Sequence, residues 1–154
     1  MGLTVKLHTG LTETDINDYT FSAYVIDKDW KHYIKNLTYD GYYKAEKSEM
    51  LFEYPCSYHN SFRRELCMII GKDKDAWFCD YSEWDNTLPF SKFFQFADND
   101  GCLDWETCYE LYRDFYNYQA IAKEKLNKTY YETYSWWLKA FKKASVKLGV
   151  IQYS

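Results

Sequence analysis

The residues best suited to chemistry are the acidic ones of a short turn, Asp98-Asn99-Asp100-Gly101, together with Asp104 just after it. In the calcium loop of an EF-hand, oxygen ligands come from alternating positions, and the sixth residue is a glycine that allows a sharp bend. With Gly101 in the sixth place, Asp98, Asp100 and Asp104 fall on the third, fifth and ninth positions. This half of the pattern is typical of a weak calcium site.

The other half of the loop pattern lacks its main ligands. Phe96 stands in the first position, normally an aspartate, and Thr107 stands in the twelfth, which normally supplies a bidentate glutamate. An alternative interpretation needs no metal: Asn99 to Gly101 tolerates positive φ in a turn, and Asp104 caps the helix that follows. We favour the turn and cap, and expect no cofactor, with calcium as the alternative.

Two adjacent arginines, Arg63 and Arg64, form a second candidate site. A helix is predicted to begin after a cap at Asn60 or Ser61, and both arginines then face outward or sideways. The same helix has its apolar stripe at Phe62, Leu66, Ile69 and Ile70, with Gly71 as its stop. Arginines can hold a phosphate while Tyr or Trp stacks on a base, so one hypothesis is a protein that sequesters a small signalling nucleotide. A solvated helix face is the commoner role for such a pair.

Aromatic residues are unusually abundant, since 17 Tyr, 10 Phe and 6 Trp make up 21% of the chain. Tyrosine and tryptophan outside a core are strong anchors in protein interfaces. The helix after Asp104 is predicted to bury Cys108, Leu111, Phe115 and Tyr118, which leaves Tyr109 and Tyr116 nearer the outside. The last helix likewise leaves Tyr131 and Trp136 outside. These four residues, Tyr109, Tyr116, Tyr131 and Trp136, are the predicted partner-binding set.

Recognisable catalytic motifs are absent from the sequence. It contains no Gly-rich phosphate loop, no G-x-S-x-G elbow and no H-E-x-x-H pair. The three histidines, His8, His32 and His59, are scattered, and acidic pairs are common on solvated surfaces. The sequence therefore favours a protein without enzymatic activity.

Length and charge limit the classes of protein further. The 154 residues suit one globular domain spanning residues 1–154. Nineteen basic and 23 acidic residues give a net charge of −4 without long runs of one sign, which argues against nucleic acid or a membrane as the main partner. The first residues resemble no signal peptide, and five irregularly spaced cysteines suit reduced thiols. We expect a cytoplasmic protein.

Periodicity along the first half of the chain predicts mostly short elements. Alternation over residues 3–7 indicates a strand, and a polar loop is expected to run from there to Asn17. Residues 19–26 indicate a second strand, and residues 27–37 a short helix. The Asp40-Gly41 pair predicts a hairpin turn, and residues 49–54 are expected to be extended.

The second half is predicted to be mainly helical. Phe90, Phe93 and Phe94 after Pro89 indicate a short helix. Residues 129–148 predict a long helix ended by Gly149, whose core seam is Tyr130, Tyr134, Trp137, Phe141, Ala144 and Leu148. Residues 150–153 form a last strand that pairs with the first. The predicted fold class is α+β: a small antiparallel sheet, including the N- and C-terminal strands, packed against about four helices.

Two segments carry a resemblance to a known family. The segment Ser57-Tyr58-His59-Asn60-Ser61-Phe62-Arg63-Arg64, followed by Pro89-Phe90 and the Asp98 to Gly101 turn, resembles a family of small uncharacterised proteins from phages and actinobacteria. That family has a Ser-Tyr-x-x-Phe-x-x-Phe-Arg-like helix before a His-Ser-Asp-Cys-Asp-Gly-like turn, and the match covers about a third of this chain. Here Phe96-Ala97 stands in place of His-Ser. The resemblance implies an origin in a phage or mobile element and assigns no residue roles.

These observations rank three functions. The first is a protein-binding module, such as a phage accessory protein that inhibits a host factor or a bacterial defence in the manner of an anti-CRISPR protein. Its partner would be a host protein in the host cytoplasm. The second is the nucleotide-sequestering protein, and the third is the weak calcium binder.

Overall fold

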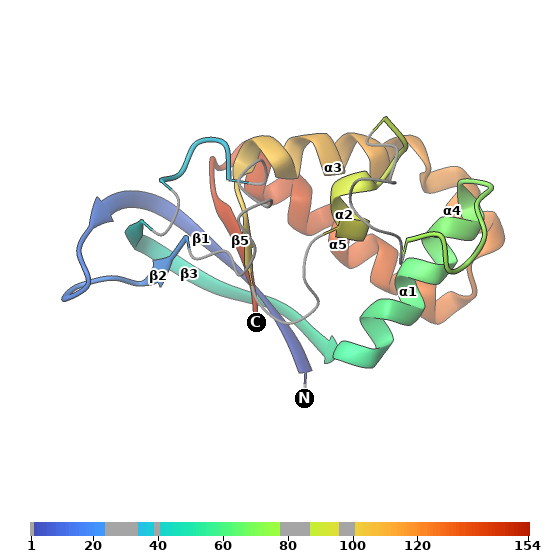
Figure 1. The fold of residues 1–154 in the computed structure, drawn as a ribbon, viewed down its shortest axis with the longest axis horizontal. Helices are drawn as coiled ribbons and strands as arrows, with labels where there is room; N and C mark the ends of the chain where they lie inside the picture. The colour runs from blue at the N-terminus through green and yellow to red at the C-terminus, as the bar shows by residue number, and fades with distance from the viewer. Residues whose placement is uncertain (1, 24–33, 39–40, 78–86, 96–100) are drawn as a thin grey trace.

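The computed structural model describes residues 2–23, 34–38, 41–77, 87–95 and 101–154. They form an α+β fold in which a five-stranded antiparallel sheet has the order β2-β3-β1-β5-β4 (Figure 1). The strands are β1 (Gly2–Thr14), β2 (Phe21–Ser22), β3 (Tyr42–Pro55), β4 (Gly101–Leu103) and β5 (Val150–Tyr153). The helices are α1 (Cys56–Ile69), α2 (Ser91–Gln95), α3 (Trp105–Asn117), α4 (Gln119–Lys125) and α5 (Lys128–Val146).

The two terminal strands pair in the centre of the sheet, as predicted. Leu7 lies opposite Ile151, and the main chains of Thr4 and Ser154 exchange hydrogen bonds of 2.8 and 3.0 Å. The bounds of β5, Val150–Tyr153, match the prediction. The first and last strands of the chain are therefore neighbours in the sheet.

The prediction of a loop between residue 7 and Asn17 is wrong, because β1 continues to Thr14 and pairs along its length with β3. The alternation that marks a strand holds over residues 3–7 but not beyond, because His8 is buried next to Leu7 and none of residues 9–14 is buried. Gly10 adopts a φ of 67°, which also obscures the pattern. β3 is likewise much longer than the predicted segment of residues 49–54.

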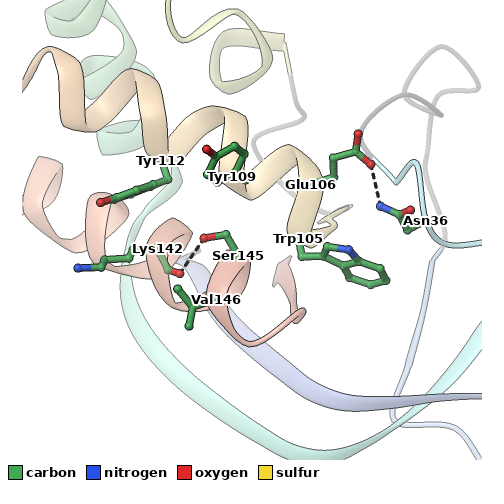
Figure 2. A pocket seen from close by; sticks show the side chains of 8 residues that line it. All are labelled: Asn36, Trp105, Glu106, Tyr109, Tyr112, Lys142, Ser145 and Val146. Atoms are coloured by element: carbon green, nitrogen blue, oxygen red, sulfur yellow. Dashed lines mark hydrogen bonds between the residues drawn. The ribbon is translucent and has the colours of Figure 1, made fainter.

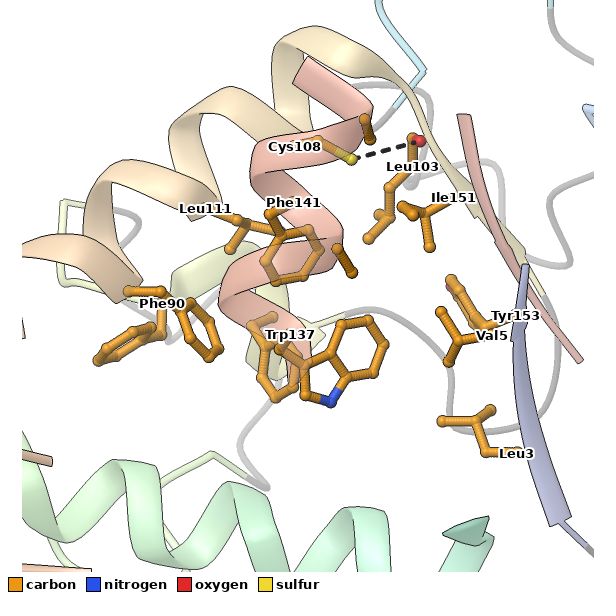
Figure 3. Packing of buried hydrophobic residues seen from close by; sticks show 14 of the residues in the cluster. Leu3, Val5, Phe90, Leu103, Cys108, Leu111, Trp137, Phe141, Ile151 and Tyr153 are labelled. Atoms are coloured by element: carbon orange, nitrogen blue, oxygen red, sulfur yellow. Dashed lines mark hydrogen bonds between the residues drawn. The ribbon is translucent and has the colours of Figure 1, made fainter. Parts of the chain in front are cut away.

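The core lies between the sheet and the helices, which gather on one side of it (Figure 1). Leu3 and Val5 of β1 and Tyr153 of β5 point toward Trp137 of α5 (Figure 3). Trp137 and Phe141 stack with their ring centroids 5.2 Å apart. Burial of such rings supplies most of the hydrophobic stabilisation, because each removes a large apolar area from water. The predicted seam of α5 is confirmed from Tyr134 to Ala144.

Three helix predictions need correction. α1 begins at Cys56 and not after Asn60, because β3 runs directly into it through Pro55. α4 was not expected; its only buried residue is Ala122, so its apolar stripe is too weak to recognise. Leu148, placed on the core seam, is 61% exposed and lies beyond α5, where it takes a φ of 51°.

The remaining elements fall partly outside the described residues. Of the strand expected over residues 19–26, only Phe21 and Ser22 form β2; Tyr19, Thr20 and Ala23 lie outside it, and residues 24–26 are not described. Most of the helix expected over residues 27–37 and Asp40 of the hairpin turn lie outside the described ranges as well. In the part of the chain that the structure describes, no helix is long and apolar enough to span a membrane.

Candidate functional site

A groove lies between α3 and α5 (Figure 2). It has a volume of about 620 Å³. Three aromatic residues of α3 form one wall, and the opposite wall comes from the last turns of α5. Its lining residues are Asn36, Trp105, Glu106, Tyr109, Tyr112, Lys142, Ser145 and Val146. We call this the α3–α5 groove.

The helical repeat of α3 explains why its aromatic residues line the groove. Trp105, Tyr109, Tyr112 and Tyr116 recur at intervals of four, three and four, so they share one face of the helix. The adjacent face, about a quarter-turn round the helix, carries Cys108, Leu111 and Phe115, which are buried. The predicted stripe of α3 is thus confirmed at these three positions, and Tyr118 is half-buried.

Two of the predicted anchors belong to this face. Tyr109 lines the groove with 51% of its surface exposed, and Tyr116 is 61% exposed beside it. The ring of Tyr116 lies 5.9 Å from that of Tyr112. The guanidinium of Arg113 lies 6.0 Å above the ring of Tyr109. This wall therefore offers apolar ring surface with polar hydroxyls at its edge.

The other two predicted anchors lie on α5, away from this wall. Trp136 is 41% exposed and packs on Phe52 of β3, with ring centroids 5.7 Å apart. Tyr131 is only half-buried and packs against the core, and its hydroxyl accepts a hydrogen bond from Gln119 at 3.4 Å. The structure brings Tyr109 and Tyr116 together, and places Trp136 and Tyr131 separately.

An ionic cluster lies beside the groove, on the first half of α3. Lys35 donates to Glu110 at 2.6 Å, and Lys92 of α2 is paired with the same carboxylate. Burial opposes ionisation of Glu110, but the hydrogen bonds from both lysines outweigh it and lower its pKa. The hydrogen bond to Glu110 raises the pKa of Lys35. These pairs fasten the segment of residues 34–38 and α2 to α3.

Of the predicted calcium ligands, Asp98 and Asp100 lie outside the described residues. Asp104 is buried and caps α3 as predicted: one carboxylate oxygen accepts from the N–H of Thr107 at 2.9 Å, and the other from that of Asn36 at 2.8 Å. Among the described residues, no three His, Cys, Asp or Glu side chains are close enough to hold a metal ion. The calcium site stays a prediction, which a rise in melting temperature in millimolar calcium would support.

The two arginines lie in different environments. The prediction that Arg63 faces outward or sideways is wrong, because only 3% of it is exposed. Its Nε donates to the carbonyl of Phe93 at 3.2 Å, and its guanidinium lies 5.3 Å above the ring of Trp77. Arg64 is exposed and paired with Asp75 at 3.1 Å. Arg64, Asp75 and Trp77 line a separate hollow of about 510 Å³ with Asn60, so neither arginine reaches the α3–α5 groove.

A buried polar cluster around Tyr54 has no recognisable signal in the sequence. The Tyr54 hydroxyl lies 2.5 Å from Nδ1 of His59 and accepts a hydrogen bond from the Trp137 indole at 2.9 Å. Burial raises the pKa of Tyr54. Burial, followed by the charge of Arg63, holds the pKa of His59 well below its usual value. Because these residues are enclosed in the core, the cluster serves packing between β3, α1 and α5.

A second histidine is held between three strands. His8 of β1 lies 2.7 Å from the Ser48 hydroxyl of β3 and 2.8 Å from Oε1 of Gln152 in β5. Its ring stacks on Phe21 with centroids 4.6 Å apart. Burial lowers the pKa of His8, so the neutral ring is favoured. These bonds tie the strands together across the sheet.

The fold and groove define an α+β protein that carries an aromatic groove on the helices covering one side of its sheet. A scan against protein-family models matched no family, and searches of curated proteins and of solved structures found no significant match. The family resemblance drawn from the sequence remains a prediction.

Proposed function

We propose that this protein is a binding module that engages another protein through the α3–α5 groove and its tyrosine wall. One observation carries the proposal: α3 buries Cys108, Leu111 and Phe115 and leaves Tyr109 and Tyr116 more than half exposed on the adjacent face. Large aromatic side chains that remain outside a core are the residues that most often anchor a protein partner.

The shape of the surface supports the same function. The groove is lined by ring surface from α3 and by Val146 of α5, which is 74% exposed. A partner side chain that enters it would remove apolar area from water on both walls. A host protein or a bacterial defence protein as the partner rests on the sequence resemblance alone.

A small ligand is the second candidate, because a volume of about 620 Å³ falls in the usual range for ligand pockets. A nucleotide would stack on Trp105 or Tyr109 here. Its phosphate would meet Lys142 and not Arg63 or Arg64, which lie elsewhere.

The test is a tagged pull-down from bacterial lysate with the wild type and a Tyr109→Ala/Tyr116→Ala variant. The matched control is Tyr19→Ala, since Tyr19 is 49% exposed and lies before β2. We expect one stoichiometric partner that the double variant loses and the control retains, with unchanged melting temperatures. Equal capture by the double variant would contradict the proposal, and a heat-released nucleotide without a protein would favour the second candidate.

A further inference from the structure

A second groove lies on the other flank of α5. It has a volume of about 290 Å³ and is bordered by Phe52 of β3 and Trp136 of α5. Its other lining residues are Leu51, Lys139, Ala140 and Lys143. The exposed ring of Trp136 rests on Phe52, so this groove also offers aromatic surface.

A third hollow of about 240 Å³ on α5 joins the two grooves. It shares Lys139 and Lys143 with the second groove, and Lys142 and Val146 with the α3–α5 groove. The stems of the lysines form its apolar floor. The three hollows make one continuous surface across α5, which we call the α5 band.

The α5 band has aromatic ends and a positive centre. Lys143 is paired with Glu49 at 2.5 Å. Within the described part of the chain, Lys139, Lys142 and Lys147 make no ion pair. This local excess of positive charge contrasts with the net charge of −4 for the whole protein. A complementary surface carries negative charge opposite the lysines.

We infer that the partner presents an acidic segment flanked by apolar side chains, which lies across the α5 band with one apolar group in each groove. This inference rests on the proposed protein-binding function and specifies its partner's chemistry. Trp136 and Val146 are ten positions apart, about 15 Å along the helix axis. An extended segment of about five residues spans that distance.

A polypeptide fits this surface better than a nucleic acid. The carboxylate of Glu106 lines one groove, and that of Glu49 lies against Lys143 at the other. A phosphate backbone would meet both negative charges, whereas an acidic peptide can direct its carboxylates at the central lysines alone. The apolar walls at each end also suit side chains such as Leu or Phe.

The experiment selects binders from a displayed library of random 16-residue peptides on the immobilised protein. The affinity of one selected peptide, made synthetically, is then measured by fluorescence anisotropy. The test variant is Lys139→Gln/Lys142→Gln/Lys147→Gln. The matched control, Lys123→Gln/Lys125→Gln/Lys128→Gln, makes the same change of charge at exposed lysines around α4. We expect acidic residues between apolar ones, affinity reduced roughly tenfold in the test variant and unchanged in the control, and a steep fall in affinity with salt.

The other outcomes are distinguishable. The selected peptides could lack acidic residues, bind the lysine test variant as tightly as the wild type, and fail to bind Tyr109→Ala/Tyr116→Ala. That result would overturn the inference and leave the proposed function standing. Peptide affinity that is unchanged in the lysine test variant and in Tyr109→Ala/Tyr116→Ala would overturn both the inference and the proposed function. Failure to select any peptide, or binding of oligo(dT) that the test variant loses, would overturn the acidic-segment inference.

Discussion

The carboxylate of Asp104 holds the main chain of Asn36, 68 residues earlier, while it caps α3. Its two oxygens accept from the N–H groups of Asn36 and Thr107 at 2.8 and 2.9 Å. The Asn36 side chain also donates to Glu106 at 2.9 Å. Since Asn36 and Glu106 both line the α3–α5 groove, the residue that starts the helix also positions one end of the groove.

Removal of this carboxylate should destabilise the fold. Asp104→Ala leaves the buried N–H of Thr107 and the part-buried N–H of Asn36 without their acceptor, and we expect the free energy of unfolding to fall by about 1–3 kcal/mol. Asp104→Asn keeps one oxygen acceptor and should lose less. Urea unfolding followed by circular dichroism measures both, and an Asp104→Ala variant as stable as the wild type would contradict this role.

The Tyr54 hydroxyl is expected to matter for stability more than that of its neighbour Tyr58. Tyr54→Phe removes the acceptor of the Trp137 indole and the partner of His59 inside the core, which should cost about 1–3 kcal/mol. Tyr58→Phe is the control, because its hydroxyl bonds Thr133 at 2.9 Å where water has access, and should cost less than about 1 kcal/mol. Equal losses of unfolding free energy in urea titrations would show that burial does not set the difference.

The regular parts of this fold could be predicted from the sequence because local periodicity determines them. The cap at Asp104, the buried stripe of α3 and the exposure of Tyr109 and Tyr116 follow from one helix and its 3.6-residue repeat. The strand over residues 150–153 follows from an apolar run after a glycine.

The parts that could not be predicted depend on residues far apart in the chain. Arg63 is buried because the carbonyl of Phe93 and the ring of Trp77 receive its guanidinium, and neither contact has a local signal. The second wall of the groove belongs to α5, and Asn36 reaches it only through Asp104. The exposure of Tyr109 and Tyr116 could therefore be predicted, whereas the burial of Arg63 and the groove beside Tyr109 could not.

Substitutions at Leu148 and Gly149, just after α5, should have opposite effects on stability. Leu148 is exposed at a φ of 51°, so Leu148→Gly should relieve strain and change stability by between zero and about +1 kcal/mol. Gly149 has no such φ, but an added Cβ would lie 2.8 Å from the carbonyl oxygen of His8 and 2.9 Å from Leu7 Cδ1. Gly149→Ala should therefore lower the melting temperature. A lower melting temperature for Leu148→Gly than for Gly149→Ala would contradict this assignment.

Stability should fall below neutral pH because His8 and His59 both have lowered pKa values in the folded protein. In the unfolded chain a histidine titrates near pH 6.5, so below that pH the unfolded state binds more protons than the folded one. The stabilisation is complete above pH 6.5 and is lost as the pH falls through the folded pKa values. Between pH 7.5 and 5.5 we therefore expect the free energy of unfolding to fall, seen as a lower urea midpoint.

The control for this pH dependence is His8→Gln, which can keep polar contacts to Ser48 and Gln152 but does not titrate. It should remove the part of the loss that His8 contributes, while His59 continues to contribute. The carboxylates with lowered pKa values, Glu49 and Glu110, titrate below this window and leave it unaffected. Equal urea midpoints at pH 7.5 and 5.5 in the wild type, or an unchanged pH dependence in His8→Gln, would show that buried neutral histidines do not govern stability in this range.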